Sequence, residues 1–373
     1  MTGRRTAKRV ALWVVIAVGC VGVPVLAQQA PPASANDIDR VDQDQIEADR
    51  KVHEERQKRL QSKDVRALAA VVDAALASGA AALPSDFPIA WSHDYFKARN
   101  DQTYVPYTLS FPQAATTAES VVMYLRLVRR GVPAPVASAV SGEPPSVPSA
   151  RSPELEDAHV IGIRKPIDPL EPYRLSRALV VDGGEFDAYV AIRELGTEPA
   201  KTSVLAYALT VPDLTSDLAA SSMLLNPRIA QLAAPLSPLE QESRPYALGS
   251  VELTPAWSTK LTKSDTLTLF LFIYNAQLVP ENGKPDVVVD YNFYSVIGGT
   301  ERFFNKTNPQ EYSAETMPPQ WDASLGHQLN VGLAGVPLTS FPLGSYRLEV
   351  KVTDKRAGTS VTRDLLFDLA AGS

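Results

Sequence analysis

Apolar and polar side chains alternate most regularly near the C-terminus, over residues 344–369. The apolar positions in the first half of this stretch are Tyr346, Leu348, Val350 and Val352. A period of two, with the apolar side chains on one side, is typical of a half-buried antiparallel strand. Residues 354–358 then supply turn-forming side chains, and a second apolar series runs to Leu369. The stretch therefore predicts a β-hairpin whose valines lie in a hydrophobic core.

A sequence pattern similar to that of this hairpin lies upstream, over residues 184–211. In spacing and residue type, Gly184, Phe186, Val190, Ile192 and Glu194 match Gly344, Tyr346, Val350, Val352 and Asp354. Further along, Ser203-Val204 matches Ser360-Val361, with three extra residues in the earlier turn. A shorter repeated pattern precedes each hairpin: Val121, Val122 and Tyr124 match Val288, Val289 and Tyr291. Two repeated patterns in the same order predict two related β units. The alternative is that edge-type strands in general share this pattern.

Residues 36–83 follow a different pattern, without proline and dense in charged residues and alanine. The first part of this segment is charged nearly all round, whereas the second part carries an apolar stripe. The stripe has helical spacing and consists of Leu68, Val71, Val72 and Leu76. We expect a helical arm whose striped half packs on the first β unit. A helix that is polar all round favours a solvated spacer, and the alternative is a coiled-coil or partner-binding arm.

The N-terminus has the pattern of an export signal. Four basic residues precede an apolar run over residues 10–27, which ends in Val25-Leu26-Ala27. Val25 and Ala27 are small enough for the positions that a signal peptidase recognises. We therefore expect cleavage after Ala27 and an exported protein, periplasmic or extracellular. The two alternatives are an uncleaved membrane anchor and a lipidated Cys20. Only in those two cases do we expect contact with a membrane.

Composition narrows the functional classes. The net charge of −6 becomes −10 when the four basic residues of the signal are removed. An acidic chain of this kind has no electrostatic attraction to nucleic acid, so we expect no nucleic-acid partner. Cys20 is the only cysteine. A chain cleaved after Ala27 therefore has no disulfide, no thiolate metal ligand and no cysteine nucleophile.

These patterns divide the chain into consecutive segments. The expected order is a signal peptide (1–27), a tether (28–35), the charged helical arm (36–83), a first β domain (84–211), a linker (212–244) and a second β domain (245–373). A proline-rich loop (132–153) interrupts the first β domain, because six prolines there favour extended chain.

Several stretches of the second β domain carry a family resemblance. They are Tyr246-Ala247-Leu248-Gly249-Ser250, LTLFLFIYNA at 267–276, DVVVDY at 286–291, ERFFN at 301–305 and the hairpin at 344–369. This region resembles the C-terminal part of secreted bacterial proteins that are related to von Willebrand factor A or carry a GWxTD motif. The resemblance implies an immunoglobulin-like fold and an envelope or exterior location, and it implies no reaction. The metal-adhesion motif D-x-S-x-S is missing, and the nearest match to GWxTD, Ala256-Trp257-Ser258-Thr259, lacks the glycine and the aspartate.

The sequence contains no recognisable catalytic or metal-binding motif. Its histidines are scattered, at His53, His93, His159 and His327. Ser92-His93-Asp94 has the composition of a catalytic triad, but triad partners converge from different elements, and neighbours on a strand point to opposite faces. We therefore expect no cofactor, no metal and no enzymatic activity. The alternative is a hydrolase whose site only the tertiary structure assembles.

Aromatic residues are the remaining candidates for a binding surface. Those singled out are Trp91, Tyr95, Trp257, Phe303, Phe304 and Trp321. Aromatic side chains in loops stack on sugars or anchor protein partners, and the alternative is that they plug the ends of the β-sandwiches.

As a whole, the sequence predicts a mainly β protein with two immunoglobulin-like β-sandwich domains in tandem, preceded by an N-terminal α-helical arm. The expected role is non-enzymatic protein–protein interaction or scaffolding in the bacterial cell envelope, with an envelope protein as partner. A carbohydrate-binding accessory module that takes a polysaccharide is the first alternative.

Overall fold

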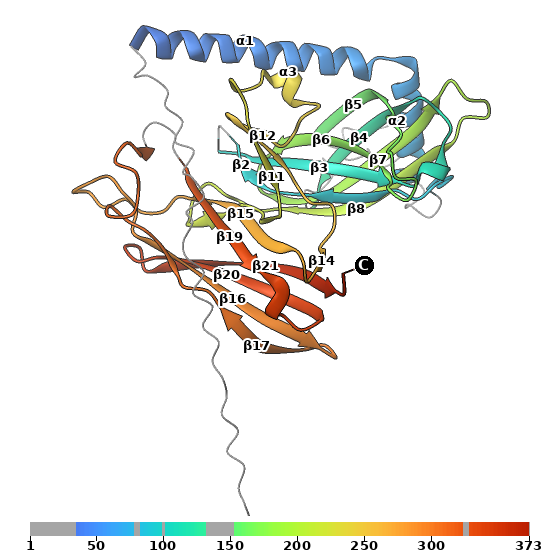
Figure 1. Ribbon diagram of the computed structural model, residues 1–373. Coiled ribbons are helices and arrows are strands. Elements are labelled where there is room, and N and C mark those ends of the chain that lie inside the picture. Colours follow the sequence, from blue (N-terminus) through green and yellow to red (C-terminus); the bar gives the residue numbers. More distant parts are fainter. Residues whose placement is uncertain (1–34, 78–82, 99–100, 132–152, 324–327, 373) are drawn as a thin grey trace, which may run out of the picture.

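The computed structural model describes residues 35–77, 83–98, 101–131, 153–323 and 328–372 (Figure 1). The protein is mainly β, as the alternating pattern predicts, and its strands form several sheets. The predicted signal peptide, Cys20 and almost all of the predicted tether and proline-rich loop lie outside the described residues. Within the described part of the chain, no helix combines the length and the apolar character needed to cross a membrane.

Two antiparallel sheets form what we call the N-terminal sheet pair. The first sheet contains β1 (Ala90–His93), β2 (Phe96–Lys97), β3 (Thr103–Phe111) and β6 (Tyr173–Val181). Both β1 and β2 pair with β3, which pairs with β6 on its other side. The second sheet contains β4 (Ser120–Arg129), β5 (Leu155–Gly162), β7 (Gly184–Leu195) and β8 (Thr202–Val211), in the order β5-β4-β7-β8. Apolar side chains of the two sheets meet in one core, and a short 3-10 helix, η1 (Gln113–Ala115), links β3 to β4.

The C-terminal sheet pair has the same order of neighbours. β9 (Ala219–Ala220) and β10 (Leu224–Leu225) pair with β15 (Thr266–Tyr274), which pairs with β19 (Leu329–Pro337) on its other side. The facing sheet contains β14 (Lys260–Thr262), β16 (Val287–Ile297), β17 (Thr300–Lys306), β18 (Gln310–Tyr312), β20 (Gly344–Asp354) and β21 (Thr359–Ala370). Its order is β14-β21-β20-β16-β17, and β18 also pairs with β16. A 3-10 helix, η3 (Leu338–Ser340), follows β19, and a second core fills the space between these sheets.

The segment between the two sheet pairs is structured. Residues 212–244, predicted to be a linker, contain β9, β10, β11 (Arg228–Gln231) and α3 (Pro238–Gln241). β11 joins β12 (Ala247–Leu248) and β13 (Val251–Thr254) in a small sheet of order β11-β13-β12. Apolar side chains from both sheet pairs then form a third core, which includes Phe96, Tyr246, Phe272 and Tyr274. Apolar packing therefore holds the two sheet pairs against each other.

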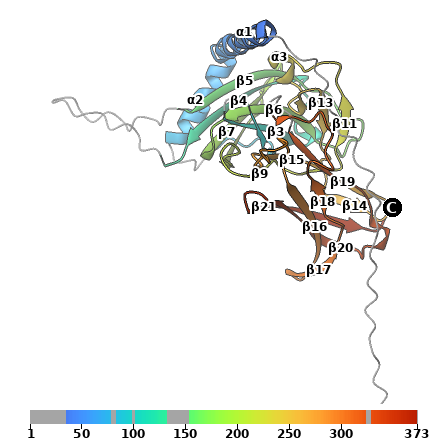
Figure 2. The ribbon, with the colours of Figure 1, turned by 90° about the vertical axis from the view of Figure 1, so that its left-hand side faces the viewer.

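Two helices lie on the N-terminal sheet pair. α1 (Ala35–Leu60) runs along the end of the molecule opposite the C-terminal sheet pair, as Figure 1 and Figure 2 show, and it contacts β5 and α3. α2 (Lys63–Ala77) places its apolar stripe on the outer face of the sheet β5-β4-β7-β8. Leu68 and Val72 are buried there against Val122 of β4. The sheet is therefore apolar on both faces.

The two long hairpins share their local geometry. β7 begins at Gly184 with φ 153°, and β20 begins at Gly344 with φ 143°, a region that side chains other than glycine rarely adopt. At the far ends of these strands, Glu194 and Asp354 are buried and accept backbone N–H groups of the turns that follow. Between these points Val190, Ile192, Val350 and Val352 are all buried, as the alternation predicts.

The shorter repeated pattern, at residues 121–124 and 288–291, is displaced by one residue relative to the structural alignment of the two hairpins. When Glu194 is aligned with Asp354, the strand pairing makes Tyr124 correspond to Asp290 and not to Tyr291. Tyr124 packs with α2, whereas Tyr291 lies in the core between the sheets. A shift of one residue along a strand moves a side chain to the other face, so this part of the sequence match was wrong. The matched return strands are displaced by one residue as well.

Candidate interaction site

The outer face of the sheet β14-β21-β20-β16-β17 is uncovered within the described part of the chain. On β16 and β20, every second position is buried over Val287–Phe293 and Tyr346–Asp354, and on β21 the alternate positions are half-buried or, at Phe367 and Leu369, buried. The intervening positions of the three strands face outward. Strand pairing then brings Phe303, Tyr294, Arg347 and Leu366 into one row across four neighbouring strands. We call these four residues the outer row.

Arg347 lies at the centre of the outer row. Its guanidinium is 4.4 Å from the centroid of the Tyr294 ring. Glu301 accepts two hydrogen bonds of 2.8 Å from it, and Asp364 and Glu349 accept one each, of 2.5 and 3.1 Å. The hydrogen bonds, led by those with Glu301, raise the pKa of Arg347 above its ordinary value. The guanidinium is thereby fixed over the aromatic ring.

Apolar side chains at both ends of the outer row remain exposed. Phe303 is 48% exposed and Leu366 is 63% exposed. The Phe303 ring meets the Tyr294 ring edge-on, with centroids 5.9 Å apart. Aromatic and arginine side chains beside exposed apolar ones are typical of the centre of a protein interface.

A second candidate site is a cleft of about 440 Å³ between the two sheet pairs. Asp94, Ser222 and Arg363 are among the residues that line it. Burial raises the pKa of Asp94, although Tyr246 and Ser222 donate hydrogen bonds to its carboxylate. Burial also lowers the pKa of Arg363, which donates to the backbone carbonyl of Ala220. The cleft therefore holds a carboxyl and a guanidinium that are both partly desolvated, as in many ligand sites.

The stretch Ser92-His93-Asp94 does not form a triad. Ser92 Oγ donates a hydrogen bond to the backbone carbonyl of Thr108 in β3, and the carboxylate of Asp94 accepts one from Tyr246 Oη. The His93 ring accepts a hydrogen bond of 2.9 Å from Trp91 Nε1 and lies 2.7 Å from Tyr95 Oη. Burial lowers the pKa of His93. The three side chains thus have separate partners, and among the described residues no group of metal-ligating side chains gathers elsewhere.

Of the aromatic residues predicted for the first β domain, Trp91 packs against the core between the two sheets, and Tyr95 reaches the cleft. Trp91 is stacked on Tyr107, with centroids 4.5 Å apart and rings nearly parallel. Tyr95 lines the cleft itself. Trp257 comes from the second half of the chain but lies beside β6, where the guanidinium of Arg174 is 5.3 Å from its ring. Trp257 is 42% exposed and has the most open ring of the predicted tryptophans described here.

The other predicted aromatic residues belong to the C-terminal sheet pair. Phe303 lies in the outer row, whereas Phe304 points to the other side of β17 and packs against Phe341 at 4.9 Å between centroids. Trp321 is only 9% exposed and joins the core, with the ammonium of Lys284 5.6 Å from its ring. The six residues are thus distributed over several surfaces and a core, and only Phe303 lies at the uncovered sheet face.

Three members of the outer row were missed from the sequence. The alternation of residues 344–369 already places Arg347 and Leu366 opposite to the core-facing positions. The alignment of these two with Tyr294 and Phe303 depends on the pairing of β16 with both β17 and β20. No single strand contains that information.

Comparisons with known proteins do not assign a function to this chain. No protein-family model matches the chain, and no curated protein matches it either. The function is therefore argued below from the outer row, the cleft and the pattern of the sequence.

Proposed function

We propose that the protein is an exported, non-enzymatic interaction protein of the bacterial cell envelope. In this proposal, two immunoglobulin-like β-sandwich domains in tandem follow an N-terminal α-helical arm. The equal order of neighbouring strands in the two sheet pairs supports the tandem arrangement, and the core between facing sheets supports the sandwich assignment. The basic and apolar pattern of the first residues supports export.

The outer row is the single observation that supports the interaction role. The helix α2 buries the corresponding face of the N-terminal sheet pair, whereas Phe303 and Leu366 stay exposed on the C-terminal one. Burying apolar surface stabilises a complex by about 25 cal/mol per Å². A partner that covers the outer row gains this term at a surface that is already rigid, because Arg347 is fixed by its hydrogen bonds.

The partner surface that fits the outer row is an apolar protein segment flanked by basic side chains. Arg347 and the three carboxylates around it together carry a formal charge of −2. Glu301 and Asp364 are 44% and 51% exposed, so basic groups of a partner can reach them. An amphipathic helix with lysine or arginine beside its apolar stripe meets both requirements, and α2 shows that a helix fits this kind of sheet face.

Site-specific photo-crosslinking in an envelope extract tests this proposal. A photoreactive residue is placed at Phe303, and a matched control is placed at Leu170, which is 91% exposed and distant from the outer row in sequence and sheet. We expect a discrete protein adduct from position 303 and none from position 170. Equal labelling at the two positions contradicts the proposal.

Substitutions then test the chemistry of the crosslinked partner. We expect the pair Phe303→Ala and Leu366→Ala to weaken its binding at least about tenfold, because a few buried anchors carry most of an interface's free energy. Leu170→Ala should bind like the unchanged protein. Affinity should also fall as salt rises, since the rim contacts are charged. Binding that survives the double substitution excludes the outer row.

A carbohydrate-binding role is the second candidate, and Trp257 is the observation that favours it. Its half-open ring with Arg174 above it is a platform on which a sugar ring could stack. A polysaccharide array compares the unchanged protein with Trp257→Ala. Retention that Trp257→Ala abolishes, and that the outer-row substitutions leave unchanged, replaces the protein-partner proposal with this one.

A further inference from the structure

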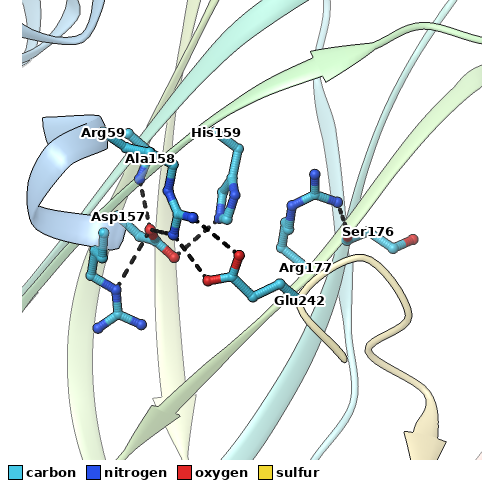
Figure 3. A network of polar contacts seen from close by, with 8 residues as sticks. Arg59, Asp157, Ala158, His159, Ser176, Arg177 and Glu242 are labelled. Atoms are coloured by element: carbon cyan, nitrogen blue, oxygen red, sulfur yellow. Dashed lines mark hydrogen bonds and ion pairs between the residues drawn. The ribbon is translucent and has the colours of Figure 1, made fainter. Parts of the chain in front are cut away.

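The N-terminal sheet pair is open along one edge, where β5 and β6 are the outermost strands of the two facing sheets. Asp157 and His159 of β5 and Arg177 of β6 lie at this edge, which we call the mouth. Figure 3 shows Asp157 joined to His159 and Arg59, with Glu242 beside them, and Arg177 nearby with its guanidinium turned to Ser176. Polar groups thus fill a place that apolar side chains occupy elsewhere in the same core.

The carboxylates of the mouth are tightly held. Arg59 donates two hydrogen bonds to Glu242, of 3.1 and 2.9 Å, and one of 3.3 Å to Asp157. His159 Nε2 lies 3.1 Å from Asp157, and Arg56 Nε lies 3.6 Å from it. Burial disfavours the ionised form of Asp157, but the hydrogen bond with His159 and the charges of Arg56 and Arg59 outweigh it and lower the pKa to about 2.

Positive charge is in excess in the mouth. The charged groups that meet there are Arg56, Arg59 and Arg177 against Asp157 and Glu242. Burial lowers the pKa of Arg177, and its Nη1 donates to the backbone carbonyl of Ser176 at 2.7 Å. A buried guanidinium without a counter-ion is costly, because the low-dielectric interior solvates a charge poorly. An anion in the mouth would remove this cost.

Hydrogen-bond donors are also in excess. Four buried side-chain atoms in the mouth have no hydrogen-bond partner among the described residues: Nε of Arg56, Nε of Arg59, Nε of Arg177 and Oη of Tyr107. Tyr107 extends from β3 into the same interior, within electrostatic reach of Asp157 and Arg177. Three of the four atoms can only donate, and a buried donor left without an acceptor is destabilising. The excess of donors therefore indicates an acceptor-rich ligand.

Arg177 also lines a pocket of about 250 Å³. Arg164, Arg174, Ser176 and Ser243 also line it, and the guanidinium of Arg174 lies 3.6 Å from the exposed carboxylate of Glu171. None of the described residues that line it carries a carboxylate. A small pocket with three guanidinium groups suits an oxyanion, because guanidinium forks match the oxygen atoms of carboxylates, sulfates and phosphates.

We propose that the mouth of the N-terminal sheet pair binds a small oxyanion of the phosphate, sulfate or carboxylate type. Arg177 and Tyr107 are its inner donors, and Arg164 and Arg174 stand at the entrance. The anion neutralises the surplus guanidinium and accepts the unpaired N–H and O–H groups. This site is separate from the outer row, and neither proposal depends on the other.

Thermal unfolding of the whole chain at constant ionic strength tests the site. Sodium chloride is replaced stepwise by phosphate, sulfate or acetate, and the transition temperature is followed. We expect the transition temperature to rise with at least one oxyanion, since a ligand that binds only the folded state stabilises it by mass action. Arg177→Gln should abolish the rise, whereas Arg302→Gln, at an exposed position of β17, should keep it. No rise with any oxyanion, or an equal rise in Arg177→Gln, overturns the proposal.

Tyr107→Phe provides a second test if Arg177→Gln does not fold. This change removes one buried O–H group and keeps the shape of the ring, so folding should be preserved. If an oxyanion accepts a hydrogen bond from Tyr107, its apparent affinity should fall about tenfold, as expected for a bond to a charged acceptor. If water alone fills the mouth, the variant and the unchanged protein respond to oxyanions identically, and the proposal is wrong.

Discussion

The sheets β5-β4-β7-β8 and β17-β16-β20-β21 have the same order of strands but different surroundings. α2 covers the first, and β4 is buried at every position from Val121 to Val128. No helix covers the second within the described residues, and β16 alternates between buried and half-buried positions from Val287 to Tyr294. The apolar pattern of a central strand therefore indicates how many of its two faces are covered: a continuous apolar run indicates two covered faces, and alternation indicates one.

The open edges of the two sheet pairs differ in the same way. The mouth of the N-terminal pair is filled by charged groups beneath α1 and α3. In the C-terminal pair, the chain that follows β18 brings Met317 and Trp321 into the core, and Lys284 donates to the carbonyls of Pro318 and Pro319 at 3.2 and 3.0 Å. The N-terminal edge holds carboxylates whose ionisation depends on pH, whereas the C-terminal edge holds apolar side chains and the ammonium of Lys284, so the N-terminal edge should respond more strongly to acid.

The largest effect is expected where the two sheet pairs are alike, in their cores. Val350→Asp places a carboxylate at a position with 0% exposure, at a cost of several kcal/mol, which approaches the whole stability of a domain, about 5–15 kcal/mol. Calorimetry should show the loss of a cooperative transition. Thr362→Asp, at an exposed position of β21, is the matched control and should unfold normally. An unchanged transition in Val350→Asp contradicts the placement of this strand.

The covered and the bare sheet faces can be compared with one type of substitution. Leu68→Ala removes a side chain with 1% exposure from under α2, and should cost about 2–5 kcal/mol through lost burial and the cavity left behind. Leu366→Ala, on the bare face, should change stability by less than about 0.5 kcal/mol. Urea denaturation measures both. Equal losses would mean that Leu366 is covered in solution, for instance by a second copy of the chain.

The charged mouth should make the N-terminal sheet pair sensitive to acid. The pKa of Asp157 is about 2 in the folded protein against 3.8 as the ordinary value. A carboxyl whose pKa is lowered on folding stabilises the folded state above its unfolded pKa, here by roughly 2 kcal/mol. That contribution is lost as the pH falls from about 4 toward 2. Melting curves across this range should show a shallower decline for Asp157→Asn, and parallel curves would refute the assignment.

The smallest effect is expected from the ion pairs of the bare face. Arg347→Gln removes contacts with three carboxylates, two of which are about half exposed. Exposed ion pairs contribute little in water, so the loss of stability should stay below about 1 kcal/mol and shrink further at high salt. Chemical denaturation at low and high salt measures this. A loss of several kcal/mol would show that Arg347 is needed for the sheet itself and not mainly for binding.

The sequence predicted part of the candidate surfaces and missed others for identifiable reasons. It pointed to Phe303 as one of six aromatic residues expected in loops, although Phe303 lies on β17 and its neighbour Phe304 packs inward. It could not indicate the mouth, since Arg59, Asp157, Arg177 and Glu242 come from four segments that no spacing rule connects. It also assigned residues 212–244 to a linker, although β9 and β10 complete a sheet with β15. Short strands carry too few residues for their alternation to be recognised.

By itself, the sequence determined the mainly β character of the protein and the core-facing residues of its long hairpins. Side chains on a strand alternate between two faces, so the apolar positions from Tyr346 to Val352 could point only toward one core. The tertiary structure alone decided what lies against the other face of each sheet. α2 covers the outer face of the N-terminal sheet, whereas Phe303 and Leu366 on the outer face of the C-terminal sheet stay exposed. Contacts between segments far apart in the chain decide this coverage, so the alternation within a strand does not reveal it.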